Sequence, residues 1–503
     1  MIPCVALGLM LANRLDAAGL DTKRINGDDA ATLLGTGTGV IVGIVDSGVD
    51  VNHPALSGTV SGGQPRLVAE ANFVTTEPTN TGDDVYGHGT AVAAQIMSRN
   101  SSHLAVATDA RYVDARVLDS TNSFSSDAWV VNGMGFAVAN GADIINLSLG
   151  YFNSNTSGNS RLSEMADYIS YGLRIPITVS AGNAGISSNP LPQGPGDAFN
   201  VFSVGSTSKA SGWSQIVSSS SYGPTTDGRD KPDISAPGDL VSTAQEHTTG
   251  YSLWSGTSFA APNVAGVLTA AIGYGQANDL STDPLVLKAA LINTAEKVLD
   301  RSGNAWAPQA ASTSAGVLTV TSPLQASAGA GQVDGLQFAK EYIAGQHGPG
   351  NVPSAGWDLD NVGTTTLDCH LGELQAGSSL STTLDWMRHV GWTDLNHNGL
   401  IDSSDAFPIL APLAHLNLYV YRDGQLIADS LSTVDDVQAL FLTNVAAGDY
   451  NIRVTRASGS GASEEFGLAW TATQVPEPST LALFALGSGA LFARRRKKDD
   501  RTS

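Results

Sequence analysis

TGVIVGIVDS, residues 38–47, is a nearly continuous run of β-branched residues that ends in a turn. Such a run is typical of a strand buried on both faces of a parallel sheet. The same pattern returns in ADIINLSLG, residues 142–150, and in IPITVSAGN, residues 175–183. The three runs therefore predict three buried strands of one sheet.

Between these runs lie two stretches with helical character, GTAVAAQIMSR (89–99) and SSDAWVVNGMGFAVANG (125–141). Strands that alternate with helices predict an α/β domain with a doubly wound, mostly parallel sheet. In such sheets ligands bind beyond the carboxyl ends of the strands. We therefore expect the chemistry at the residues that follow each strand.

The length and charge of the chain narrow the classes of protein to which it can belong. Its 503 residues exceed one compact core and predict two or more domains. Lys and Arg number 26 against 47 Asp and Glu, a net charge of −21, which disfavours nucleic acid or an anionic membrane surface as the main partner. The two cysteines, Cys4 and Cys369, provide no disulfide framework.

Three polar residues stand where predicted elements begin or end. Asp46 ends the first strand, His88 opens a helix in YGHGTAVAA, and Ser258 opens a helix in GTSFAAPNVAGVLTAA, residues 256–271. Each has an ordinary structural explanation, which for Ser258 is a helix N-cap. Together they are the carboxylate, the imidazole and the nucleophile that hydroxyl-based acyl transfer needs. We expect the three at one edge of the sheet.

Six stretches, in this order along the chain, resemble the subtilisin-like serine proteases, or subtilases: VIVGIVDSGVDVNHPAL, GHGTAVA, NLSLG, SAGNAG, KPDISAPG and GTSFAAPNVAG. The order Asp, His, Ser is also that of subtilisin. The resemblance implies a subtilisin-like peptidase domain over residues 24–346. It also implies that Asp46 orients the imidazole, His88 acts as general base and then as general acid, and Ser258 is the nucleophile.

The resemblance implies an oxyanion hole as well. Asn183 of SAGNAG would donate its side-chain amide to the developing negative charge. The backbone N–H of Ser258, at the start of a helix, would be the second donor. No cofactor is required for this chemistry.

Substrate-binding residues follow from the same resemblance. The backbone of Ser148, Leu149 and Gly150 would bind an extended peptide by strand addition. A broad subsite lined by Gly182 would give a weak preference for apolar side chains. Leu147 and Leu149 have the alternative role of packing in the core.

Two departures from the family pattern concern calcium and the N-terminus. Some subtilases place a calcium-binding acid after HP, but Ala55 stands there, so that site is not carried over. Residues 1–23, which begin MIPCVALGLMLANRLD, lack the features of a secretory signal, and the family's propeptide is missing. We therefore interpret residues 1–23 as an N-terminal remnant and expect a truncated or misassigned start.

The character of the chain changes after residue 346. GQHGPGNVPSAG predicts a Gly/Pro linker over residues 347–365. Residues 366–473 alternate apolar and polar side chains around turn signals such as Asp423-Gly424, which predicts a smaller all-β domain, jelly-roll or sandwich-like. This domain loosely resembles the pre-peptidase C-terminal modules of secreted proteases, and whether it binds substrate, saccharide or the protease itself stays open.

DLNHNGLIDSSD, residues 394–405, fits a calcium loop of the EF-hand type, with Asp402 acting through water if at all. The expected calcium would be structural and would brace the β domain. The alternative is a polar turn whose Asn and Asp side chains satisfy their own backbone. The predicted ligands are Asp394, Asn396, Asn398, Leu400 through its carbonyl, and Asp405 in place of the usual Glu.

Residues 474–503 resemble a PEP-CTERM sorting signal: Pro476-Glu477-Pro478, an apolar stretch, and a basic cluster from Arg494 to Lys498. The uncharged run from Leu481 to Ala493 is short for a transmembrane helix unless its flanks extend it. The basic cluster would stay on the cytoplasmic side. The resemblance implies transient anchoring in the inner membrane, a cut by a sorting transpeptidase, and release to the surface or outside of a Gram-negative bacterium. The alternative is a plain membrane anchor.

These observations together predict an exported serine endopeptidase that hydrolyses proteins or peptides through an acyl-enzyme on Ser258. The alternative is a catalytically weak, surface-displayed binding or matrix protein that keeps the subtilase fold. A third function, calcium-dependent adhesion through the β domain, is compatible with either.

Overall fold

The computed structural model describes residues 19–77, 82–152, 155–459 and 461–474. Within these residues, strands in the order β2-β3-β1-β4-β5-β6-β7 form one sheet, and all neighbouring pairs are parallel. The predicted parallel α/β fold is therefore confirmed. The strands are β1 Ile41–Asp46, β2 Leu67–Asn72, β3 Arg111–Arg116, β4 Ile144–Leu147, β5 Ile177–Ser180, β6 Phe202–Thr207 and β7 Ile234–Pro237.

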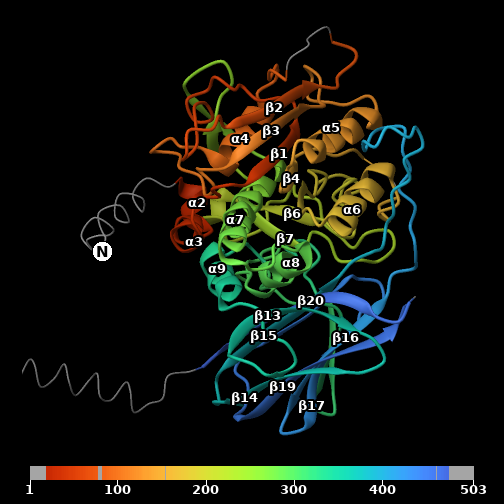
Figure 1. Ribbon diagram of the computed structural model, residues 1–503. Helices are drawn as coiled ribbons and strands as arrows, with labels where there is room; N and C mark the ends of the chain where they lie inside the picture. The colour runs from red at the N-terminus through yellow and green to blue at the C-terminus, as the bar shows by residue number, and fades with distance from the viewer. Residues whose placement is uncertain (1–18, 78–81, 153–154, 460, 475–503) are drawn as a thin grey trace, which may run out of the picture.

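Helices cover both faces of this sheet (Figure 1). Val42 and Ile44 of β1 pack in one core with α4 and α7, whereas Val45 packs in a second core with α5 and α6. Burial on both faces explains the continuous apolar run of β1. The helices are α2 Leu20–Arg24, α3 Gly27–Leu34, α4 His88–Met97, α5 Asp127–Ala139, α6 Arg161–Leu173, α7 Thr257–Asn278, α8 Pro284–Asn293 and α9 Gly335–Ala344.

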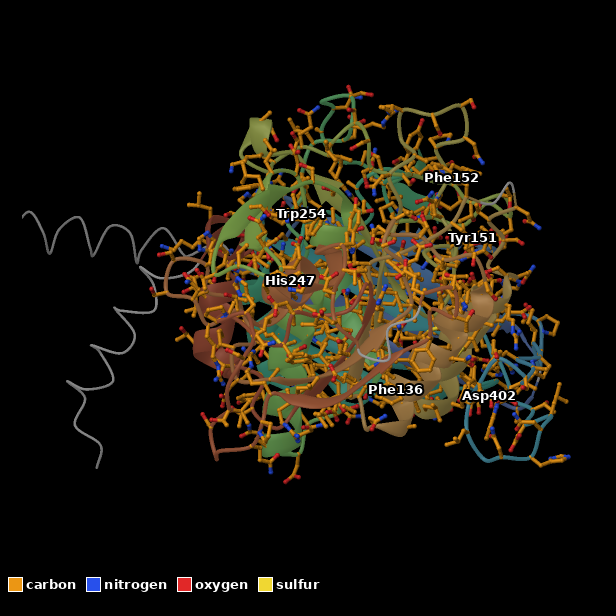
Figure 2. The ribbon with its side chains drawn as sticks, turned by 90° about the horizontal axis from the view of Figure 1, so that it is seen from above. Phe136, Tyr151, Phe152, His247, Trp254 and Asp402 are labelled. Atoms are coloured by element: carbon orange, nitrogen blue, oxygen red, sulfur yellow. The ribbon has the colours of Figure 1, made fainter. Side chains whose placement is uncertain are left out.

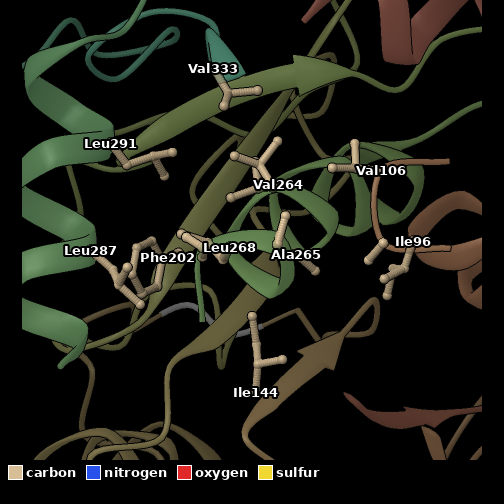
Figure 3. Packing of buried hydrophobic residues seen from close by; sticks show 14 of the residues in the cluster. Ile96, Val106, Ile144, Phe202, Val264, Ala265, Leu268, Leu287, Leu291 and Val333 are labelled. Atoms are coloured by element: carbon tan, nitrogen blue, oxygen red, sulfur yellow. The ribbon is translucent and has the colours of Figure 1, made fainter. Parts of the chain in front are cut away.

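Helix α7 lies at the centre of the larger core (Figure 3). Its Val264 and Leu268 are fully buried, and Leu287 and Leu291 of α8 belong to the same cluster. Phe202 of β6 completes the contact between helix and sheet (Figure 3). The position of α7, and so of the residues at its start, is fixed by this packing.

The C-terminal part of the chain is a β-sandwich below the α/β part in Figure 1. Its two sheets have the strand orders β10-β11-β17-β16-β19-β14-β12 and β13-β20-β15-β18, with a shared core between them. The sandwich confirms the predicted all-β domain. The strands are β10 Ala310–Ser314, β11 Val317–Ser322, β12 Gly350–Asn351, β13 Ala355–Val362, β14 Leu367–Leu374, β15 Ser379–Trp386, β16 His415–Arg422, β17 Gln425–Ser430, β18 Val437–Leu442, β19 Gly448–Ser458 and β20 Glu464–Thr473.

The segment predicted as a linker, residues 347–365, is instead part of the sandwich. It carries β12 and β13, and β13 pairs with β20 along its whole length. After Gly356 the sequence Trp357-Asp358-Leu359-Asp360 alternates apolar and polar side chains, as a strand does. Strands β10 and β11, inside the predicted peptidase range, also join the sandwich, because β11 pairs with the distant β17.

The sandwich packs directly on α8. Gly467 of β20 lies so close to this helix that a Cβ atom there would overlap the carbonyl of Leu285. Lys288 of α8 is buried beside three carboxylates, at 3.3 Å from Asp436, 3.4 Å from Asp385 and 3.7 Å from Asp233. Burial opposes the charge of Lys288, but the three carboxylates raise its pKa above the ordinary value. An ionic contact therefore joins the two parts of the chain.

We expect Lys288→Ala to lower the free energy of unfolding by about 3–5 kcal/mol, because it leaves the buried carboxylates of Asp385 and Asp436 without their ion-pair partner. Denaturant unfolding measures this cost. The matched control is Arg174→Gln, which removes a partly exposed arginine that pairs with Glu465 across the same interface and with Asp283 just before α8. Its cost should stay below about 1 kcal/mol. Equal effects of the two substitutions would contradict the expectation.

Candidate active site

The sequence-predicted residues gather at one edge of the parallel sheet. Asp46 is the last residue of β1, Ser148 follows β4, and Gly182 lies just beyond β5. Helix α4 begins at His88, and helix α7 begins at Thr257, directly before Ser258. This edge is where doubly wound sheets bind their ligands.

Asp46 and His88 form a buried hydrogen-bonded pair. The Nδ1 atom of His88 lies 2.6 Å from Oδ1 of Asp46, and the two side chains are 6% and 0% exposed. Phe259 packs on the imidazole, with ring centroids 5.2 Å apart. Burial alone would lower the pKa of His88, but the charge and hydrogen bond of Asp46 outweigh it and raise this pKa above 6.5.

A second buried carboxylate, Asp84, holds the loop that leads into α4. Its Oδ1 atom accepts from Gly87 N and Ser47 Oγ, and its Oδ2 atom accepts from the backbone N–H and the hydroxyl of Thr90. Burial raises the pKa of Asp84. Sequence reasoning missed this residue, although an acid four positions before His88 was the available signal.

Ser258 is the second residue of α7, and Gly256 is the N-cap. The Ser258 hydroxyl donates to the carbonyl of Ser148 at 3.1 Å, and the Ser148 hydroxyl donates to the carbonyl of Ser258 at 2.7 Å. The alternative of an N-cap role for Ser258 is therefore wrong. Among the described residues, no hydrogen bond joins Ser258 to His88 in this state.

Asn183 is exposed and has a fixed side-chain orientation. Its Oδ1 atom accepts from the backbone N–H of Thr257 at 2.9 Å and from the Thr257 hydroxyl at 3.2 Å. The same hydroxyl accepts from the backbone N–H of Gly182 at 3.1 Å. With its oxygen used in this way, the amide Nδ2 of Asn183, which has no hydrogen-bond partner among the described residues, can serve a bound group.

A cavity of about 350 Å³ opens beside Ser258 and Asn183. The predicted residues Ser148, Leu149, Gly150 and Gly182 line it. Leu147 and Leu149 are both buried in the second core, so the alternative of core packing holds for both, although Leu149 also reaches the cavity. Figure 2 shows Tyr151 and Phe152 on one side of this face and Trp254, which contacts the ring of His88, on the other. Sequence reasoning missed further lining residues, which no local motif marks: Leu118, Asn122, Ser123, Phe124, Tyr151, Phe152, Ser180 and Gln193.

The loop 394–405 lies on α5 and not on the sandwich, so the predicted bracing of the β domain is wrong. A Cβ atom on Gly135 of α5 would overlap the carbonyl of Ile401, and Ser403 N donates to Asn132 at 2.7 Å. Figure 2 shows Asp402 and Phe136 of α5 toward the same edge of the molecule, and both line one cavity. The sequence pattern predicts the loop, but it does not predict that the loop packs against α5.

The predicted calcium ligands use their oxygens within the loop. Asp394 accepts from Gly399 N at 2.8 Å, and Asp405, which is buried, accepts from Trp392 Nε1 and Asp402 N at 2.9 and 3.0 Å. Two more bonds of this kind come from Asn398 N to Asn396 Oδ1 and from Leu400 N to Asn398 Oδ1. The described residues hold no group of three or more His, Cys, Asp or Glu side chains placed for a metal ion. The alternative of a polar turn accounts for these bonds, and calcium stays a prediction.

The predicted sorting tail lies outside the described residues, apart from residue 474. Within the described part of the chain, no helix has both the length and the apolar character needed to cross a membrane.

Comparisons with known proteins place this site in a family. The model of the subtilase family matches residues 37–321, and that of the PEP-CTERM protein-sorting motif matches residues 474–497. Thermitase of Thermoactinomyces vulgaris is 34% identical over 276 residues, 54% of this chain and 86% of that protein. Subtilisin NAT of Bacillus subtilis subsp. natto is 36% identical over 235 residues, 46% of this chain but only 55% of that protein. The crystal structure of a cold adapted subtilisin-like serine proteinase aligns with a TM-score of 0.42 and 28% identity, over 54% of this chain and 88% of that one.

We expect the pKa of His88 to lie above its ordinary value in the wild type and to fall in Asp46→Asn. The substitution keeps an oxygen near the ring but removes the larger of the two negative charges that oppose burial, and leaves only that of Asp84. NMR titration of labelled histidine rings measures both values, and exposed His247 serves as the internal control. An unchanged His88 titration would contradict the assignment of Asp46 as the group that sets it.

Proposed function

Because the chain belongs to the subtilase family and is thus a subtilisin-like serine endopeptidase, we propose that it cleaves proteins through an acyl-enzyme on Ser258. The observation that supports this most directly is the 2.6 Å bond between Asp46 and His88 at the sheet edge where α7 presents Ser258. These are the three groups that hydroxyl-based acyl transfer requires.

In the proposed reaction, the Ser258 hydroxyl turns from the carbonyl of Ser148 toward Nε2 of His88. Its oxygen attacks the scissile carbonyl carbon while His88 takes the proton and later gives it to the leaving amine. A water molecule then attacks the acyl-enzyme by the same route and releases Ser258. Asp46 holds Nδ1–H of His88 throughout and stabilises the imidazolium that forms.

The developing oxyanion would be bound by Asn183 Nδ2 and by the backbone N–H of Ser258. Asn183 fits this role because Thr257 holds its oxygen and leaves the N–H₂ group available. The first N–H groups of α7 have no partner within the helix, so one of them can serve the anion. Each such donor is oriented before the reaction begins, so it needs no reorganisation when the negative charge develops.

Substrate would bind as an extended strand along Ser148, Leu149 and Gly150. The side chain before the scissile bond would enter the 350 Å³ cavity above Gly182. Leu149 and Phe124 offer apolar surface there, while Asn122, Ser123 and the serines are polar. This mixture favours a weak preference for apolar side chains rather than a strict one.

The chain carries a PEP-CTERM sorting motif, and we propose export as its consequence. The tail would anchor the chain briefly in the inner membrane of a Gram-negative bacterium, until a transpeptidase cuts near Pro476–Pro478 and releases it to the surface or the outside. Calcium at the 394–405 loop is no part of the proposed chemistry, every step of which uses groups of this chain and water.

We expect a fluorophosphonate probe to label the wild type and to leave Ser258→Ala unlabelled, because the probe reacts only with an activated serine. The matched control is Ser255→Ala, which removes a hydroxyl bound to Asp239 just before α7 and should keep full labelling. Probe incorporation is read by mass spectrometry on the folded protein. Labelled Ser258→Ala, or an unlabelled wild type, refutes the nucleophile and returns the alternative of a non-catalytic binding protein.

We expect Asn183→Ala to lower kcat by about a hundredfold to a thousandfold with little change in KM, because the lost donor acts on the transition state. Asn183→Asp separates this role from the bond to Thr257, since it keeps the acceptor but loses the donor. Steady-state kinetics on a chromogenic peptide measure both variants. A kcat near that of the wild type in Asn183→Asp would show that Asn183 is only structural.

A further inference from the structure

One wall of the 350 Å³ cavity is formed by Gln193, and Gln193 and the next residue, Gly194, bridge the segments that follow β4 and β5. Tyr151 N donates to the carbonyl of Gly194 at 3.1 Å, and Gln193 N donates to the carbonyl of Ala181 at 2.9 Å. A Cβ atom on Gly182 would stand 2.6 Å from Cγ of Gln193, so this side chain lies directly over the glycine. Residues 193–194 therefore set the width of the cavity.

The residues that follow this wall are bound to the start of α6. The carboxylate of Asp197 accepts from Gly158 N at 3.0 Å and from Ser163 Oγ at 2.7 Å. Asn200 N donates to Asp167 Oδ1 at 2.7 Å. All of residues 194–200 are buried, so the wall has little freedom of its own.

Arg388, which follows β15 of the sandwich, ties both of these segments together. Its guanidinium binds Asp167, with Nε at 2.9 Å from Oδ2, and also donates to Asn159 Oδ1 at 2.8 Å and to the carbonyl of Gly158 at 2.5 Å. Its backbone N–H and carbonyl bind the amide of Asn200 at 2.8 and 2.9 Å. The side chain is 4% exposed.

Two guanidinium groups contact the ring of Phe199. The centre of the Arg388 group lies 4.2 Å from the ring centroid, and that of Arg229 lies 3.6 Å from it. Both contacts are buried, where a cation over a ring is worth most. In Figure 1 the light-blue segment after β15 rises from the sandwich past α6 to the level of α5. At this point the C-terminal part of the chain therefore contacts the α/β part, for example through Arg161 of α6 and the carbonyl of Ser403.

We propose that Arg388 is a positioning residue for the substrate cavity, through which the β-sandwich sets cleavage specificity. The inference rests on the proposed function, since it takes the cavity to be the subsite for the side chain before the scissile bond. Arg388 does not line the cavity and acts through Asp167, Asn200 and the buried segment that ends at Gln193. Asp46, His88 and Ser258 lie outside this set of contacts.

A loosened wall affects the binding of a large side chain more than the chemical step. The energy of that side chain in the cavity depends on close contact with Gln193, whereas the reacting groups keep their own hydrogen bonds. Loss of Arg388 should therefore raise KM for substrates with a large side chain, leave kcat nearly unchanged, and spare substrates with alanine at that position.

The experiment compares Arg388→Lys with the wild type in the full chain. Lysine keeps a charge for Asp167 but lacks the planar set of donors that reaches Gly158 and Asn159 together. We expect KM for a phenylalanine substrate to rise about tenfold in Arg388→Lys, with kcat within about twofold of the wild type. The alanine substrate should change less than about threefold, and a small fluorophosphonate should label Ser258 at the normal rate.

The matched control is Arg174→Gln, which breaks another arginine–carboxylate contact between the two domains without touching residues 158–200 other than its own helix end. It should leave the ratio of the two KM values unchanged. Hydrogen exchange of the peptide 193–200 gives a readout independent of activity, and it should become faster in Arg388→Lys but not in Arg174→Gln.

Two results in Arg388→Lys would overturn the inference. In the first, the KM values for the phenylalanine and alanine substrates keep their wild-type ratio. In the second, kcat falls for every substrate in proportion to the fraction of enzyme that the fluorophosphonate still labels. The second pattern is that of a merely structural residue. An unlabelled wild type, by contrast, refutes the proposed function itself, and the hydrogen exchange of residues 193–200 then still decides whether Arg388 holds the wall.

Discussion

The hydrogen bonds between the first turn of α7 and the ends of β4 and β5 constrain the whole site. Thr257 binds both Asn183 and Gly182, and Ser258 exchanges hydrogen bonds with Ser148. Because α7 is packed through the larger core, its start cannot move without the sheet. The proposed nucleophile, the proposed oxyanion donor and the proposed substrate-binding segment are thus parts of one rigid unit.

The electrostatic arrangement follows from burial of acids in a chain with an excess of negative charge. Asp84 is buried and receives hydrogen bonds from the backbone at the start of α4, and its charge adds to that of Asp46 in raising the pKa of His88. The conformation of the loop before α4 and the raised pKa of His88 therefore both depend on the Asp84 carboxylate. A carboxylate without these N–H donors would be far costlier to bury.

The local patterns of the sequence were sufficient for the parallel sheet and for bringing the catalytic candidates to one edge. In a run such as residues 38–47, the continuous apolar composition itself predicts burial on both faces of the sheet. The carboxyl ends of parallel strands also lie at one edge of that sheet. The roles of β11 and Arg388 depend on partners more than a hundred residues away, which no periodicity encodes. The linker at 347–365 was mispredicted because its Gly and Pro residues outweighed the short alternating pattern behind them.

Strand β20 lies between β13 and β15, and its Gly467 is in contact with α8. During synthesis on the ribosome, β13 and β15 cannot pair with β20 until residues 464–473 have been made. The carboxylates around Lys288 belong to the same interface, so the emerging peptidase domain keeps an unfinished surface until then. Completion of the fold is in this way timed by synthesis of the strand that stands immediately before the sorting motif.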